Sequence, residues 1–120
     1  MAKIIVIEDS YYQKVLLNTI LTSDGHEILN ASNGNEGLEM ILSHEPDCIL
    51  MDLSMPVFTG QELLKTLQEK NIKIPVIVIT ADIQDSSKNQ CLQMGAKAYI
   101  TKPVDKKELQ ESLNNILGNK

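Results

Sequence analysis

The chain has 120 residues, which is enough for one domain of ordinary size and too few for two. It carries a net charge of −5, and all eleven of its basic residues are lysines. Because arginine is the side chain best shaped to grip phosphates and guanine bases, this composition argues against direct binding to nucleic acid.

Five short apolar runs are spaced along the chain, and we expect each to form a strand. The first, third and fourth are unbroken and rich in branched residues, which is typical of strands buried on both faces of a parallel sheet. The second and fifth are weaker candidates of the same kind. In chain order the runs are Ile4–Ile7, Glu27–Ala31, Cys48–Met51, Val76–Ile79 and Ala98–Thr101.

A segment with helical spacing follows each expected strand. Four of these segments place apolar residues on one face: Leu16, Leu17, Ile20 and Leu21; Leu38, Ile41 and Leu42; Leu63, Leu64 and Leu67; and Leu109, Leu113, Ile116 and Leu117. Their starts match a reciprocal capping pattern, closely or loosely, at Ser10 with Gln13, Asn33 with Glu36, Thr59 with Glu62 and Asp105 with Glu108. Strand and helix alternating five times predict an α/β fold, a parallel sheet with helices on both faces.

The fourth helical segment, Gln84–Met94, differs from the others because it is mostly polar. We expect it to bury little beyond Cys91 and Leu92 and to end at Gly95. Since few apolar contacts would hold it, this helix should be the loosest of the fold and the one most available to move.

The cysteines and the apolar runs bear on location. Cys48 lies in an expected strand, and its spacing from Cys91 is not that of metal ligands, so two idle thiols indicate a reducing compartment. No run is long enough to span a bilayer, and the first ten residues do not resemble a signal peptide. We therefore expect one domain over residues 1–120 that works in the cytoplasm, away from membranes.

Polar residues follow the expected strands at the edge where parallel α/β sheets bind their ligands. Glu8 and Asp9 follow the first strand, and Asp52, Thr80 and Lys102 follow the third, fourth and fifth. One aspartate in such a place is more often a helix cap, but three carboxylates at one edge would repel each other without a cation. Oxygen ligands alone select a hard ion such as Mg²⁺.

These groups together would suit a phosphoryl group, because a divalent ion, a lysine and a hydroxyl can all contact its oxygens. Spacing alone does not say which carboxylate is the nucleophile. The segments IVIEDS, ILMDLSMPVFTG, VIVITA and AYITKP resemble the response-regulator receiver family of two-component signalling, over essentially the whole chain. The resemblance implies a doubly wound, flavodoxin-like sheet of five parallel strands in the order 2-1-3-4-5, with five helices.

The resemblance also implies roles for individual residues. Asp52 would take a phosphoryl group from a phosphohistidine of a sensor kinase, with Lys102 contacting the phosphoryl oxygens. Mg²⁺ would bind Asp9, Asp52 and the backbone carbonyl of Ser54, and Glu8 would act through water. The chain would then be a phosphoacceptor that assists its own phosphotransfer and dephosphorylation, and not a conventional enzyme.

The switch is implied in the same way. Thr80 would swing toward the phosphoryl group and Tyr99 would turn inward with it, although Tyr99 could instead be an ordinary half-buried strand residue. The Lys102–Pro103 bond would be cis. Ser54, Ala81 and Asp82 stand where residues tune the access of water.

Other residues have plainer expected roles. Pro56 and Gly60 would shape the loop after Asp52, and Met55 would serve packing. His26 and His44 would lie on the surface, away from the carboxylates.

Rival classes fit less well. A flavodoxin needs a phosphate-binding loop where Glu8 and Asp9 stand, and an aspartyl-phosphate hydrolase places its nucleophile after the first strand. A pseudo-receiver would lack one of the five functional groups, and a DNA-binding regulator would need an output domain.

We expect the partners to be a sensor histidine kinase and a downstream target protein or phosphatase, with the chain monomeric until phosphorylated. A chemotaxis-type regulator is the first choice. A phosphorelay intermediate and a receiver excised from a hybrid kinase or transcription regulator remain open alternatives.

Overall fold

The computed structural model describes residues 2–55 and 58–118, so Pro56 lies outside the described residues. Five parallel strands form one sheet in the order β2-β1-β3-β4-β5. Their bounds are β1 (Lys3–Ile7), β2 (Glu27–Ala31), β3 (Cys48–Asp52), β4 (Val76–Thr80) and β5 (Ala98–Thr101). The chain runs outward from β1 to β2 and then crosses back to β3, so the strand order reverses between β1 and β3.

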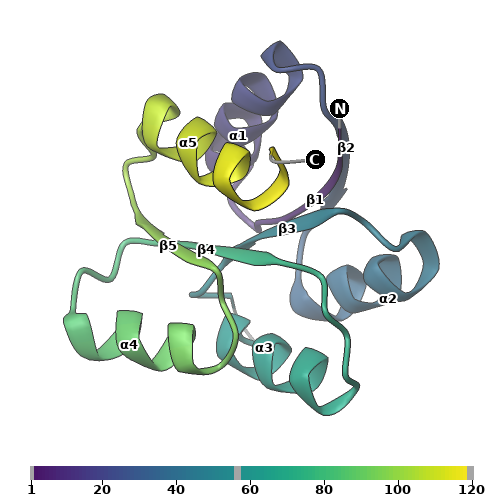
Figure 1. The fold of residues 1–120 in the computed structure, drawn as a ribbon, viewed down its shortest axis with the longest axis vertical. Helices are drawn as coiled ribbons and strands as arrows, with labels where there is room; N and C mark the ends of the chain where they lie inside the picture. Colours follow the sequence, from purple (N-terminus) through teal and green to yellow (C-terminus); the bar gives the residue numbers. More distant parts are fainter. Residues whose placement is uncertain (1, 56–57, 119–120) are drawn as a thin grey trace.

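Five helices cover the two faces of the sheet. They are α1 (Tyr11–Ser23), α2 (Gly34–His44), α3 (Gly60–Glu69), α4 (Asp85–Gln93) and α5 (Lys106–Leu117). Figure 1 shows α1 and α5 on one face and α2, α3 and α4 on the other. The predicted fold class is therefore confirmed, with strand bounds close to those expected.

The core has two layers because successive strand residues point to opposite faces. Ile4, Val6 and Leu50 pack with α1 and α5 on one side. Ile5 and Ile49 pack with α2, α3 and α4 on the other. The central strands β3 and β4 are buried along their whole length, as their unbroken apolar runs predict.

Side-chain caps begin the four helices at the predicted positions. Ser10, Asn33, Thr59 and Asp105 each accept a hydrogen bond from the backbone N–H three residues on. Only Thr59 and Glu62 complete the reciprocal pair. At α2 the Glu36 carboxylate accepts instead from the N–H of Ser32, one residue before the cap.

Two apolar residues expected in the core are exposed, so those predictions are wrong. Leu42 is 53% exposed and Leu92 is 38% exposed. Each directly follows the last buried residue of its helix, Ile41 in α2 and Cys91 in α4. One residue is a turn of about 100° around a helix, which carries both leucines off the buried stripe.

The histidines lie at the amino end of β1, opposite the strand ends that carry the acidic residues. His26 is half-buried, and its Nδ1 accepts the Ala2 N–H at 3.1 Å. His44 is exposed, and its carbonyl accepts from Lys3 Nζ.

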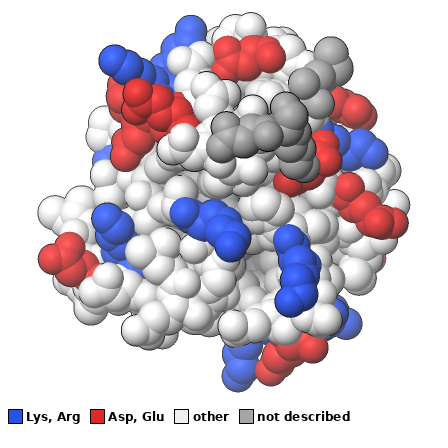
Figure 2. Space-filling view, in the orientation of Figure 1, with Lys and Arg blue, Asp and Glu red and all other residues white. Residues whose placement is uncertain are grey.

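Charges of both signs are spread over the face seen in Figure 2, where lysines and carboxylates are interspersed. No helix within the described ranges is long and apolar enough to cross a membrane.

Candidate functional site

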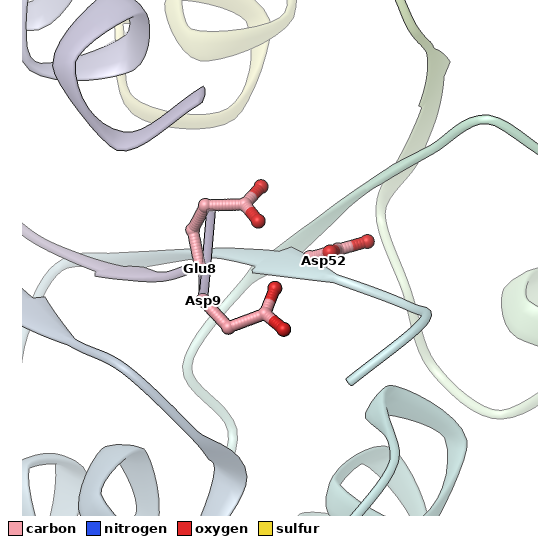
Figure 3. A group of neighbouring side chains, drawn as sticks. All are labelled: Glu8, Asp9 and Asp52. Carbon is pink, nitrogen blue, oxygen red and sulfur yellow. The ribbon is translucent and has the colours of Figure 1, made fainter. Parts of the chain in front are cut away.

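Three carboxylates meet at the carboxyl end of the sheet, where β1 and β3 lie side by side. Glu8 and Asp9 directly follow β1, and Asp52 is the last residue of β3. One oxygen from each lies within 4.8 Å of the other two. Figure 3 shows the three side chains gathered around one space. Glu8 and Asp52 are 1% and 6% exposed, whereas Asp9 is open to solvent.

Lys102 completes this group from β5's side of the sheet. Its Nζ lies 3.3 Å from Glu8 Oε1 and 3.5 Å from Asp52 Oδ2. The backbone N–H of Lys102 donates to the Thr80 carbonyl at 2.7 Å, which fixes the start of the segment after β5 to the end of β4. The Lys102–Pro103 peptide bond is cis.

Backbone N–H groups hold the two buried carboxylates in place. Ser10 N–H donates to Glu8 Oε2 and Ser54 N–H donates to Asp52 Oδ1, each at 3.1 Å. Asp52 is thereby held by the residue two positions on, while its second oxygen faces Lys102.

Burial dominates the electrostatics of Glu8, raising the pKa of this carboxyl to about 7. The Ser10 N–H opposes the rise in pKa, the negative charge of Asp52 adds to it, and Lys102 opposes it again. Although Lys102 lies close, Glu8 Oε1 has no hydrogen-bond partner. Glu8 and Asp52 therefore share the charge of Lys102, and Glu8 Oε1 keeps a lone pair that can accept a hydrogen bond or bind a cation.

This arrangement fits a hard divalent cation. The ligands are carboxylate oxygens within reach of one another, which Mg²⁺ prefers. A cation would also stabilise the ionised form of Glu8, which burial disfavours.

The loop after β3 is packed closely against the site. A Cβ on Gly60 would lie 2.9 Å from Leu53 Cα and 3.0 Å from the Asp52 carbonyl oxygen, so only glycine allows this approach. Gly60 N–H also donates to the Leu53 carbonyl at 3.2 Å. Met55 is buried in the core beside α3, in line with its expected packing role.

Thr80, fully buried at the end of β4, is one residue beyond the strand partner of Asp52. Its Oγ1 accepts the N–H of Asp82 at 3.1 Å. The half-buried Tyr99 donates its hydroxyl to the Asp82 carbonyl at 2.9 Å, so Thr80 and Tyr99 are linked through one residue. Burial is the main reason that the pKa of Tyr99 is raised.

Three hydrogen bonds near the site were not predicted from the sequence. Ser10 is predicted only as a helix cap, yet its N–H also holds Glu8. The Asp82 carboxylate, expected only near the path of water, accepts from Gln84 N–H at 2.9 Å and from the Ser87 hydroxyl at 2.6 Å. A carboxylate just ahead of a helix whose own N-cap is a glutamine is the signal that could have revealed it.

Comparison with known proteins is consistent with this geometry. The model of the response regulator receiver domain matches residues 4–114. The chain is 34% identical to Protein PilH of Pseudomonas aeruginosa, over 98% of this chain and 99% of that protein. It is 29% identical to Sporulation initiation phosphotransferase F of Bacillus subtilis, over 96% and 93%. The receiver domain of the Francisella response regulator 1452 superposes with a TM-score of 0.94 at 30% identity, over 99% and 98% of the two chains.

Proposed function

The chain belongs to the response-regulator receiver family, and from that membership we propose that Asp52 accepts a phosphoryl group from a phosphohistidine of a sensor kinase. The observation that carries the proposal is the setting of Asp52, which is buried with Lys102, Glu8 and Asp9 close to its carboxylate.

The choice of Asp52 among the three carboxylates rests on their contacts. Glu8 is the most buried, and its Oε2 is taken by Ser10 N–H. Asp9 stands outermost and exposed. Asp52 has one oxygen held by Ser54 N–H and the other facing the Lys102 ammonium, an orientation suited to attack on an incoming phosphorus.

In the proposed step an Asp52 oxygen forms a bond to phosphorus as the bond between phosphorus and the histidine nitrogen breaks. The electron pair of the broken bond stays on the imidazole, which takes up a proton. Lys102 would then face the phosphoryl oxygens, and its charge offsets theirs as the group transfers.

Asp9, Asp52 and the Ser54 carbonyl would hold Mg²⁺, with Glu8 acting through water. The ion would supply positive charge opposite the phosphoryl oxygens. The close carboxylates support this set, and Ser54 follows Asp52 by two residues at the same loop.

The sensor kinase would dock beside the site on α1. Tyr11 and Tyr12 are 79% and 73% exposed, and Val15 is exposed one turn further along the helix. Large apolar side chains gathered on a surface mark contact sites for other proteins. Because α1 begins two residues after Asp9, a helical partner on this patch would bring its histidine toward Asp52.

The output would be a change at the face formed by α4, β5 and α5, where a downstream protein or phosphatase binds. Thr80 and Tyr99 would transmit it, and the chain would be monomeric before phosphorylation and would not act as a conventional enzyme. Residues 1–120 would work as one receiver in the cytoplasm, where the free thiols of Cys48 and Cys91 stay reduced. A chemotaxis-type regulator remains our first choice for the pathway.

The test is labelling with acetyl phosphate and Mg²⁺, followed by mass spectrometry of the intact chain and its peptides. We expect the modification on Asp52 alone, and no labelling of Asp52→Asn. Asp85→Asn, which changes an exposed aspartate of α4, is the matched control and should label like the wild type. Labelling of Asp52→Asn at the wild-type rate would overturn the proposal.

A further inference from the structure

Asp82, in the loop between β4 and α4, uses every one of its polar groups within the fold. Its N–H donates to Thr80 Oγ1 at 3.1 Å, and its carbonyl accepts from the Tyr99 hydroxyl at 2.9 Å. Its two carboxylate oxygens accept from Gln84 N–H at 2.9 Å and from the Ser87 hydroxyl at 2.6 Å. Asp82 thus joins Thr80 at the end of β4, Tyr99 of β5 and Ser87 in the first turn of α4.

The carboxylate matters because little else holds the start of α4. The N-cap residue Gln84 makes no side-chain hydrogen bond to the helix, unlike the caps of the other four helices. Cys91 is the one buried residue among the described residues of α4. Asp82 therefore tethers the start of α4 from outside the helix, through the N–H of the N-cap residue Gln84 and the hydroxyl of Ser87.

The carboxylate of Asp82 is ionised near neutral pH. The Ser87 hydroxyl and then the Gln84 N–H lower the pKa of Asp82. Hydrogen bonds to an ionised acceptor are shorter and stronger than neutral ones, which agrees with the 2.6 Å contact to Ser87.

The hydrogen bond between Asp82 and Thr80 connects the start of α4 to the end of β4. A hydroxyl can accept one hydrogen bond and still donate its own hydrogen, so Thr80 can hold Asp82 while it donates to another oxygen. If Thr80 moves toward a phosphoryl group on Asp52, its partner Asp82 moves with it. Because Asp82 is hydrogen-bonded to Ser87 of α4 and to the Tyr99 hydroxyl, its displacement would shift both of them.

We infer that Asp82 is a positioning residue that couples Thr80 to α4 and Tyr99, with the Ser87 hydroxyl as its contact on the helix. This inference rests on the proposed phosphorylation of Asp52 and deepens it, because it names the connection through which the switch reaches the distal face. Asp82 does not touch the reacting atoms and acts through Thr80.

The experiment uses the full chain with Mg²⁺, with and without beryllofluoride as the mimic of the phosphoryl group. Ser87→Ala and Asp82→Ala break the contact, and Asp82→Asn keeps one acceptor for Gln84 N–H and tests rescue. Ser86→Ala is the matched control, because it removes an exposed hydroxyl one residue away. The readouts are amide exchange over 85–93, the ring signals of Tyr99 and the rate of Asp52 labelling by acetyl phosphate.

Without the mimic, we expect exchange at the start of α4 to rise about five-fold in Ser87→Ala, the size typical for loss of one hydrogen bond, and not in Ser86→Ala. With the mimic, the wild type and Ser86→Ala should show a shift at Tyr99 that Asp82→Ala loses and Asp82→Asn partly regains. Labelling of Asp52 should stay within about two-fold of wild type in Ser86→Ala and Ser87→Ala, because both changes lie on α4 and leave the reacting groups in place.

Two results would overturn the inference while leaving the proposed function intact. One is normal labelling with the same Tyr99 shift in Asp82→Ala as in the wild type, which would leave Asp82 only the role of holding the start of α4. The other is equal exchange in Ser87→Ala and Ser86→Ala. A wild-type protein that fails to label at Asp52 would instead refute the proposed function, and the inference with it.

Discussion

Replacing Glu8 by Gln should remove most of the pH dependence of stability that the site imposes on the metal-free protein. Burial raises the pKa of Glu8 from 4.5 to about 7 in the folded state, so the folded chain binds a proton that the unfolded chain releases. The stabilisation is fully present below pH 4.5 and is lost as the pH rises through about 7. Between about pH 5.5 and about pH 8, this shift lowers the free energy of unfolding by about 2 kcal/mol.

The assay is urea unfolding in EDTA at both pH values, for the wild type and Glu8→Gln. Every other titratable group is common to both proteins, so its contribution cancels in the comparison. We expect the wild type to lose about 2 kcal/mol more than the variant as the pH rises. Glu39→Gln, at an exposed position on α2, is the control and should behave like the wild type.

Addition of Mg²⁺ at about pH 8 should restore stability to the wild type and less to Glu8→Gln, since a cation near Glu8 favours its ionised form. The same pH dependence in Glu8→Gln and the wild type would refute the reasoning, because it would mean that the Glu8 carboxyl is not protonated in the fold.

Three further predictions concern the site and its support. Asp9→Ala should weaken Mg²⁺ binding at least about ten-fold by calorimetry. Ser54→Ala should bind Mg²⁺ like the wild type, because the proposed ligand there is a backbone carbonyl. Equal Mg²⁺ affinities of Asp9→Ala and Ser54→Ala would contradict the ligand set. Lys102→Ala should slow labelling of Asp52 by acetyl phosphate about 100-fold, as loss of a charge facing the transferring group usually does, and an unchanged rate would exclude that role. Gly37→Ala should lower the free energy of unfolding, measured in urea, by about 1–2 kcal/mol, because its Cβ would lie 2.5 Å from Ile7 Cδ1. Ile7→Val in the same chain should offset part of this loss. Additive effects of the two substitutions would argue against the clash.

The strands and the meeting of the acidic residues could be predicted because both follow from local pattern plus one topological rule. Unbroken apolar runs specify buried parallel strands, and parallel strands place their carboxyl ends at one edge. Glu8, Asp9 and Asp52 each stand at or just after the end of such a run, so their proximity needed no knowledge of side-chain packing.

The finer contacts could not be predicted, since they depend on segments far apart in the chain. The burial of Glu8, which shifts its pKa, arises from the surrounding fold, and the position of Lys102 depends on how β5 aligns with β4. Leu42 and Leu92 have the residue type of core positions, but where the buried stripe of a helix ends depends on what it packs against. The bonds that converge on Asp82 come from β4, α4 and β5 at once.

The contrast between α3 and α4 bears on where a change at Asp52 can spread. Three buried leucines and a complete capping box hold α3, whose first residue packs directly on the Asp52–Leu53 backbone. Burying a leucine is worth roughly 1.5–3 kcal/mol, so shifting α3 would cost several kcal/mol more than shifting α4, which buries only Cys91 among its described residues. A rearrangement at the carboxyl edge should therefore leave α3 in place and be taken up by α4. Because Asp82 bonds both Thr80 and Ser87 of α4, the helix with the fewest buried contacts is also linked to Thr80 through a single residue.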